Sequence, residues 1–125
     1  MKRIIKTDNA PQAIGPYSQA VEINGILFIS GQVPIDPITM KVVEGGIKEQ
    51  TQQVMKNIGE VLEEAGYCFD DVVKSTCMLS DMRHFKEMNE VYGQFYKEDP
   101  PARAAFAVKE LPLSVMIEIE TIAVK

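Results

Sequence analysis

The sequence predicts a single α+β domain in which two helices cover one face of a sheet. Asn24 and Gly25 separate two runs of β-prone residues and tolerate the positive φ angles of a type I′ turn, so a hairpin is expected there. Apolar residues recur every three or four positions over 47–65 and 85–96, which is the spacing of amphipathic helices. The segment 115–124 alternates as a strand does, yet it is apolar on both faces.

The N-terminal third is expected to contain only strands and loops. A short strand at 3–5 pairs beside the hairpin, which occupies 21–30. A loop follows Gly31, with a small ribbon near 40–43. The residues that mark this loop are Pro34, Asp36, Pro37, Gly45 and Gly46.

Two helices are predicted in the rest of the chain. The first covers 47–65 and ends at Gly66, a residue that adopts the left-handed conformation of a helix end. Its apolar stripe consists of Ile47, Val54, Met55, Ile58, Val61, Leu62 and Ala65. The second covers 85–96 and ends before Pro100, since proline interrupts helical hydrogen bonding.

Three further strands are expected between and after these helices. A β-rich segment at 72–79 separates the helices, and strands at 104–108 and 115–124 flank a turn at 111–113. The predicted order of elements is therefore β-β-β-α-β-α-β-β.

Length, composition and charge restrict the function. The 125 residues fit one domain spanning 1–125, and 46% hydrophobic with 25% charged residues is ordinary globular composition. The formal net charge is −5, and no run of Lys or Arg is longer than Lys2-Arg3. Nucleic acid is an improbable partner, because binding to phosphates depends on clustered cations.

Targeting signals and cysteines indicate a cytoplasmic protein. No apolar segment of signal-peptide length follows the basic N-terminus, and none approaches the roughly 18 residues that span a membrane. Cys68 and Cys77 are expected to be free thiols, since disulfides are rare outside oxidising compartments.

The second face of the sheet predicts self-association. Two helices can cover only one face, whereas the strands at 26–29 and 115–124 carry apolar residues on both. Because a large exposed apolar patch is costly, we expect a second copy of the chain to cover it.

Two glutamates and one arginine are the candidate chemical groups. Glu118 and Glu120 lie on one face of the last strand, among apolar side chains. Spacing alone favours a structural ion pair or a rim position for them over catalysis. Arg103 is a candidate partner for Glu118, or a fork that holds a substrate carboxylate by two parallel hydrogen bonds.

Other kinds of site find little support in the sequence. His84, the only histidine, lies at a helix start, where such residues are usually surface or capping groups. Cys68, Cys77 and His84 do not supply a zinc ligand set, so no metal is expected. Gly45-Gly46 lacks the pattern of a phosphate or dinucleotide loop.

Several motifs, in order along nearly the whole chain, resemble the YjgF/RidA family of reactive-intermediate deaminases, also known as endoribonuclease L-PSP-like or translation-inhibitor-like proteins. They are Asn9-Ala10-Pro11, Ile14-Gly15-Pro16-Tyr17-Ser18-Gln19-Ala20, Ile29-Ser30-Gly31-Gln32-Val33-Pro34, Pro101-Ala102-Arg103, Leu111-Pro112 and Ile117-Glu118-Ile119-Glu120-Thr121-Ile122-Ala123. The resemblance implies a chorismate-mutase-like mixed sheet, a homotrimer and one site in each cleft between subunits. It also implies hydrolysis of enamines and imines such as 2-aminoacrylate to 2-keto acids and ammonia, as by 2-iminobutanoate/2-iminopropanoate deaminases, without metal or organic cofactor.

The resemblance also implies roles for individual residues. Arg103 matches the arginine that binds the substrate carboxylate, Tyr17 the site tyrosine, and Glu118 the acid associated with the attacking water. The residues matching positions that line or support the cleft are Ser30, Gly31 and Asn89.

The sequence departs from the family pattern at one position. Ala105 stands where many members have a cysteine, so activity here cannot depend on that thiol. The backbone at Ala105 is expected to remain available to substrate or water, and Phe106 beside it is expected to alter the shape of the pocket.

Two alternatives to a deaminase remain at this point. The chain fits a regulatory trimer that binds a small carboxylate without converting it. It also fits a nuclease or translation inhibitor, although the acidic composition counts against this function.

Overall fold

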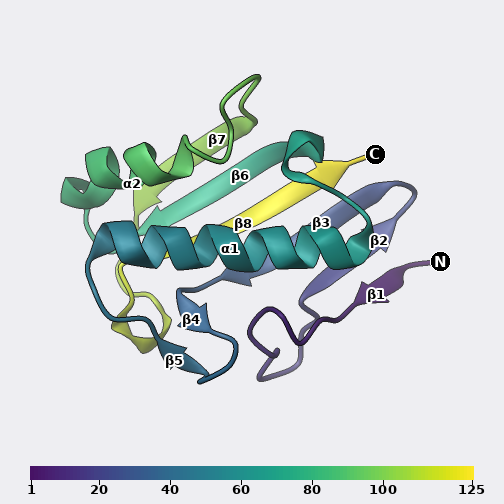
Figure 1. Ribbon diagram of the computed structural model, residues 1–125, viewed down its shortest axis with the longest axis horizontal. Helices are drawn as coiled ribbons and strands as arrows, with labels where there is room; N and C mark the ends of the chain where they lie inside the picture. Colours follow the sequence, from purple (N-terminus) through teal and green to yellow (C-terminus); the bar gives the residue numbers. More distant parts are fainter.

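The computed structural model describes residues 1–125 as a curved six-stranded sheet with two helices packed on it (Figure 1). The helices are α1 (Ile47–Ala65) and α2 (Phe85–Tyr92). The sheet strands are β1 (Arg3–Ile5), β2 (Ala20–Ile23), β3 (Ile26–Gln32), β6 (Val72–Leu79), β7 (Ala102–Ala107) and β8 (Ile117–Val124). The order of elements agrees with the sequence prediction, and a separate ribbon of β4 (Ile35–Asp36) and β5 (Lys41–Val42) lies in the predicted loop.

The sheet is mixed and places the last strand near its centre. The strand order is β1-β2-β3-β8-β6-β7, and only β6 and β7 run parallel. A parallel pair requires a crossover connection, and α2 with its flanking segments supplies it. Because β8 pairs with both β3 and β6, residues from both halves of the chain lie beside it.

The predicted hairpin is confirmed. Asn24 and Gly25 both have positive φ angles, 51° and 76°, and Ile23 pairs with Ile26 across the turn. Such angles are those of a type I′ turn, whose twist matches that of the strands it joins.

The first helix has the predicted bounds and covers the middle of the sheet. Gly66 ends α1 in the left-handed conformation, with a φ of 84°. Its buried residues pack on β3, β8 and α2, and the apolar ones belong to a 22-residue core (Figure 1). They include all seven members of the predicted apolar stripe.

Four predicted boundaries are wrong by two residues or more. The second strand of the hairpin, β3, continues to Gln32 instead of ending at residue 30. Helix α2 ends at Tyr92 rather than at residue 96. After it, the backbone amides of Gln94 and Phe95 donate to the carbonyls of Val91 and Tyr92, three residues back, as in a 3-10 turn. Tyr96 is nevertheless buried. The helical spacing of apolar residues in the sequence therefore extends past the end of the helix, because aromatic residues of the following turn also enter the core. Strand β7 begins two residues early, in register with β6, and β8 begins two residues late, after a 3-10 turn at Pro112–Ser114.

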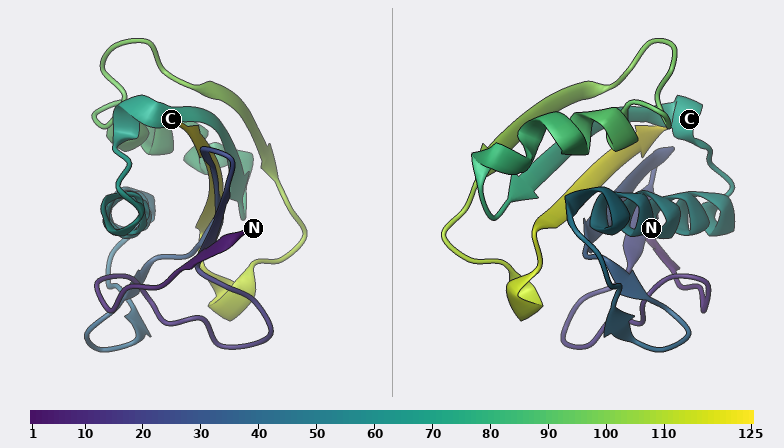
Figure 2. Two further views of the ribbon diagram at one scale, coloured as in Figure 1. Left: turned by 90° about the vertical axis from the view of Figure 1, so that its right-hand side faces the viewer. Right: turned by 60° about the vertical axis from the view of Figure 1, so that its left-hand side comes forward.

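The other face of the sheet is left open, as predicted. Both helices lie on one side, while the loop between β7 and β8 projects on the other (Figure 2). The open face carries a continuous apolar patch over β1, β2, β3 and the C-terminal half of β8, because the cross-strand partners of these strands on this side are all apolar. The patch ends at β6, where Lys74 pairs with Ile122. This patch, called the apolar face below, consists of Ile4, Val21, Ile23, Ile26, Phe28, Ile122 and Val124.

Both cysteines are free, which confirms the predicted thiols: Cys68 is exposed and Cys77 is buried. Neither helix combines the length and apolar character needed to cross a membrane.

Candidate active site

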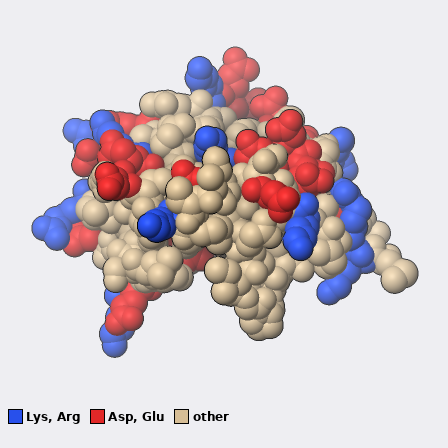
Figure 3. All heavy atoms as spheres, turned by 60° about the horizontal axis from the view of Figure 1, so that its bottom comes forward, with Lys and Arg blue, Asp and Glu red and all other residues tan.

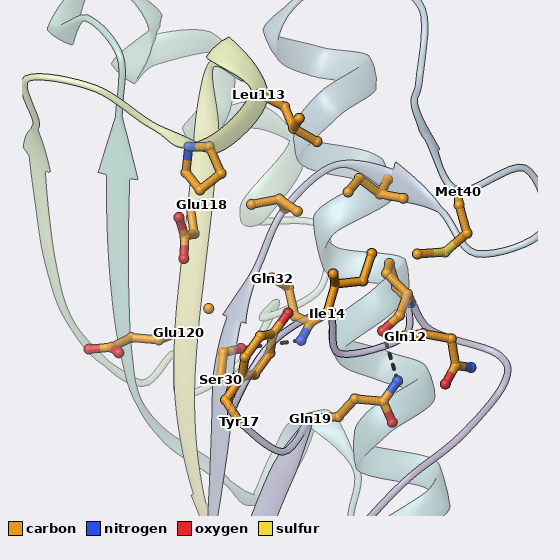
Figure 4. Close-up of a pocket in the computed structure, with 15 residues that line it drawn as sticks. Gln12, Ile14, Tyr17, Gln19, Ser30, Gln32, Met40, Leu113, Glu118 and Glu120 are labelled. Atoms are coloured by element: carbon orange, nitrogen blue, oxygen red, sulfur yellow. Dashed lines mark hydrogen bonds between the residues drawn. The ribbon is translucent and has the colours of Figure 1, made fainter.

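A cavity of about 620 Å³ opens on the sheet face away from the helices, between the N-terminal loop, β3, β8 and the turn before β8. Four residues predicted to be functional line it: Tyr17, Ser30, Gly31 and Glu118. Figure 4 shows Tyr17 and Glu118 facing this hollow from different elements, while Glu120 extends away from the other labelled side chains. The other lining residues are Pro11, Gln12, Ile14, Gln19, Gln32, Val33, Ile35, Met40, Pro112, Leu113 and Glu120.

Glu118 is a half-buried carboxylate without an ion-pair or hydrogen-bond partner. Its neighbours on β8, Ile117 and Ile119, point into the core, so strand alternation turns Glu118 to the cavity side. Burial, assisted by the like charge of Glu120, raises the pKa of Glu118 above its usual value. A carboxylate in this state is a better proton acceptor than one in water.

Gly31 makes room for this carboxylate. A Cβ at residue 31 would lie 2.9 Å from Cδ of Glu118 and would clash with its Oε2 atom. Only glycine lets the backbone of β3 approach the Glu118 side chain this closely.

The loop that carries Tyr17 is fixed by buried polar groups. The Ser30 hydroxyl donates to the carbonyl of Ser18 at 2.6 Å. The buried Gln19 side chain accepts from the Thr7 amide at 2.7 Å and donates to the carbonyls of Thr7 and Pro11, at 3.0 and 2.8 Å. These bonds set the path of residues 7–19 and leave the Tyr17 ring half exposed at the cavity.

The role of Gln19 could not be predicted from the sequence. It lies within a motif already singled out, but the side chain bonds backbone groups eight to twelve residues away, and no local pattern encodes such bonds. The apolar wall formed by Ile14, Met40 and Leu113 was also missed, because these residues come from three loops far apart in sequence.

Arg103 lies in a second, smaller hollow of about 370 Å³ between β7 and α2. Its Nη1 donates to Oδ1 of Asn89 at 2.7 Å, so the structure brings these two predicted residues together. No carboxylate pairs with Arg103; the ion pairs of the chain are Arg3–Glu22, Lys48–Glu90 and Arg83–Asp81. The guanidinium therefore keeps most of its donors free.

Arg103 and Glu118 are on opposite faces of the sheet. Arg103 is in register with the buried Ser75 on the helix side, whereas Glu118 pairs with Met78 on the other side. The expectation that Arg103 is the partner of Glu118 is wrong within one chain, because strand alternation directs the two side chains apart.

Ala105 lies on the same face as Arg103, in register with Cys77. Burial raises the pKa of the Cys77 thiol to about 11, so this neighbouring sulfur is a neutral thiol rather than a substitute nucleophile. Phe106 points to the opposite face and lines neither hollow of the single chain, so its effect on a cleft between subunits stays a prediction.

Charged side chains form no basic stripe on the face shown in Figure 3, where acidic and basic groups alternate around a largely uncharged surface. His84 directly precedes α2 and is half-buried, and its side chain makes no capping hydrogen bond. No three His, Cys, Asp or Glu side chains gather where they could hold a metal ion.

Comparison with known proteins identifies the family. The family model described as "Endoribonuclease L-PSP" matches residues 7–125. The chain belongs to this family. It is the YjgF/RidA family that the sequence motifs resemble, so that expectation is confirmed.

Relatives of this YjgF/RidA chain are similar to it over nine-tenths or more of their length. A RutC family protein from Pyrococcus horikoshii is 54% identical, with 100% of this chain and 99% of the relative covered. The human 2-iminobutanoate/2-iminopropanoate deaminase is 46% identical, with 100% and 91% covered. The crystal structure of Escherichia coli TdcF with bound serine superposes with a TM-score of 0.94 at 36% identity, covering 98% of each chain. These matches confirm the predicted fold class.

Proposed function

We propose that this YjgF/RidA protein hydrolyses 2-imino acids, and the enamines that tautomerise to them, to 2-keto acids and ammonia. The observation that carries the proposal is a pair of unneutralised groups: a free guanidinium at Arg103 and a half-buried, unpaired carboxylate at Glu118. Burial of either charge without a function would be costly. The deaminase name of the 46% identical human relative supports the same chemistry.

The two groups suit the two requirements of the reaction. The Arg103 guanidinium binds the substrate carboxylate by two parallel hydrogen bonds. Glu118 orients a water molecule and accepts its proton as the oxygen adds to the imine carbon. The C=N double bond becomes a single bond, and nitrogen gains the proton taken from the water, which gives a carbinolamine. The proton of the new hydroxyl then passes to nitrogen, through Glu118, as the C–N bond breaks, so that ammonia leaves and a carbonyl forms. Tyr17 assists by binding the water or the nitrogen, and no cofactor is required.

The site is formed where two copies of the chain meet. Arg103 and Glu118 cannot reach one substrate within a chain, because they occupy opposite sheet faces. The apolar face is large and continuous, and a second copy would cover it. We therefore place the reaction in clefts of a homotrimer, in which Arg103 and Asn89 of one subunit face Glu118, Tyr17, Ser30 and Gly31 of the next.

Variants at the two charged groups test the function. Loss of a charged partner of a desolvated carboxylate costs several kcal/mol, so Arg103→Ala should lower kcat/KM by about 30-fold or more. Glu118→Gln should lower kcat while leaving binding of 2-oxobutyrate largely intact. The assay generates 2-aminoacrylate or 2-iminobutanoate with a dehydratase acting on serine or threonine, and records ammonia and keto-acid release.

Matched substitutions at exposed sites, Arg83→Ala and Glu98→Gln, provide the controls, and every variant must keep the wild-type oligomeric state. Near-wild-type hydrolysis by Arg103→Ala would contradict the proposed function, because no other group near the cleft offers two parallel hydrogen bonds to a carboxylate.

Binding without turnover is the second candidate, favoured by the serine bound to TdcF, a relative of the same fold. In that case 2-oxobutyrate or serine would bind, and Arg103→Ala would abolish binding, while wild-type protein would release no ammonia. RNA cleavage that persists after removal of contaminating nucleases would point instead to a nuclease.

A further inference from the structure

Three side chains on one face of α2 contact the Arg103 guanidinium. Phe85, Asn89 and Tyr92 lie on successive turns of this helix, so their side chains point the same way. The Arg103 Cζ atom lies 5.4 Å from the centre of the Phe85 ring and 5.0 Å from that of Tyr92. Both distances are within the range of cation–π attraction.

None of these three side chains neutralises the guanidinium. Asn89 accepts one hydrogen bond from the guanidinium through its neutral amide oxygen, and the two rings contribute only their π faces. An acidic partner would fix Arg103 as well, but it would occupy the fork and cancel its charge. The surroundings thus orient a cation while keeping it available to an anion.

The Tyr92 ring is itself held firmly. It is 5% exposed, and its ring centre lies 4.9 Å from that of the buried Tyr96. Its hydroxyl is buried near Ser75. Burial raises the pKa of Tyr92, so the hydroxyl stays neutral and no phenolate competes for Arg103.

We propose that Phe85 and Tyr92 are positioning residues for Arg103: their rings, with Asn89, hold the guanidinium in an orientation that leaves its remaining edge free for a substrate carboxylate. The carboxylate role rests on the proposed function, whereas the restraint of Arg103 is a property of the free protein. Neither ring contacts the reacting atoms, so their loss should weaken substrate binding more than the chemical step.

The test compares Phe85→Leu and Tyr92→Leu with the conservative variants Phe85→Tyr and Tyr92→Phe. Each leucine variant should raise the KM of the imine and the Kd of 2-oxobutyrate about 10-fold, the size of a desolvated cation–π contact, with little change in kcat. The conservative variants, which keep a ring, should stay near wild type. Phe69→Leu is the control, because Phe69 packs on Tyr96 but not on Arg103.

NMR of the Arg103 side chain in the ligand-free trimer separates this proposal from the proposed function. Restricted guanidinium rotation and ring-current shifts should be present in wild type, Phe69→Leu and the conservative variants, and reduced in either leucine variant. If they are unchanged in both leucine variants, or if Kd is unchanged, the positioning role is overturned. If wild type shows the restraint but neither binds 2-oxobutyrate nor hydrolyses imines, the proposed function fails while the restraint stands. Should Tyr92→Leu not fold, the half-buried Phe85 decides the test alone.

Discussion

Gly31 and Glu118 show how a single residue can determine a chemical property. The carboxylate occupies space that any other residue at position 31 would fill with its Cβ atom. This close packing buries Glu118 part way, and burial is the largest cause of its raised pKa. Gly31 therefore lets the Glu118 side chain pack directly against the backbone of β3.

Gly31→Ala should displace the Glu118 carboxylate and lower kcat at least about 10-fold, with a smaller effect on 2-oxobutyrate binding, because small misplacements of a catalytic group are costly. Gly46→Ala is the matched control: its added Cβ would have ordinary contacts only, the nearest at 3.8 Å from the Glu49 carboxylate. Equal kcat values for the two variants would contradict this account of Gly31.

The two thiols should differ sharply in reactivity. Because Cys68 is exposed and the Cys77 pKa is raised to about 11, a thiol reagent at pH 8 should titrate one sulfhydryl per native chain and two after unfolding. Cys68→Ser should remove the native reaction without lowering deaminase activity. Two rapidly reacting thiols in the native protein would contradict the burial of Cys77.

Sequence reasoning identified the charged residues but not how they are held. Arg103, Glu118 and Gly31 belong to contiguous motifs, so one-dimensional information sufficed. That Arg103 and Glu118 face away from each other depends on the register of β7, β6 and β8, which the motifs do not contain. The Gln19 bonds and the aromatic rings around Arg103 likewise arise only when distant segments meet.

The C-terminal end of helix α1 is held by residues from the two ends of the chain. It has no basic residue in its last turn, and residues from the two ends of the chain take over that role. Arg3 donates to the carbonyl of Ala65 at 2.9 Å and Lys125 to that of Gly66 at 2.7 Å. Cations at a helix C-terminus satisfy free carbonyls and favour the helix dipole. The strands β1 and β8 are thereby tied to the end of the helix that covers the sheet.

Glu22 completes this contact, and it predicts a pH dependence of stability. Glu22 accepts from Arg3 at 3.1 Å and from the Tyr67 hydroxyl at 2.7 Å, and these bonds lower its pKa in the folded state. A depressed folded pKa stabilises the protein above the unfolded value of about 4.3, and this contribution is lost as pH falls through the folded pKa. Glu22→Gln should therefore be less stable than wild type at pH 7, and the difference in the free energy of unfolding should shrink as the pH falls below the unfolded value of about 4.3.

Denaturant unfolding of both proteins between pH 3 and pH 7 measures this gap, with the isolated exposed Glu98→Gln as the control. A gap of equal size at both ends of the range would show that ionisation of Glu22 is not the cause.

Element boundaries were predictable where local chemistry fixes them. The Asn24-Gly25 turn and the Gly66 helix end both demand positive φ angles, and both were found where expected. The end of α2 was not, because Phe95 and Tyr96 keep packing on Phe69 after the helix has stopped. The periodic spacing of apolar residues shows which side chains face the core, and residues of a turn can continue this spacing after a helix has ended.

The two groups of the proposed site lie on opposite faces of the sheet in one chain. The half with Glu118 lies on the open side and the half with Arg103 on the helix side. Two-fold pairing of identical patches would not in general join different halves, whereas a head-to-tail ring joins them at each interface. The proposed trimer thus explains both the apolar face and the separation of the two charges. Light scattering should give about three times the 14.0 kDa chain mass.

Mixed trimers test this arrangement. Arg103→Ala and Glu118→Gln chains should each form nearly inactive trimers, but a cleft between an Arg103-intact subunit and a Glu118-intact neighbour contains both groups. Random 1:1 mixing by joint refolding should therefore restore about one quarter of wild-type activity, since each ring interface pairs unlike halves. Native mass spectrometry of one tagged variant verifies the mixing, and trimers assembled separately and then combined are the control. If verified mixed trimers are no more active than that control, Arg103 and Glu118 do not act together across a subunit interface. This result would contradict a site shared between subunits.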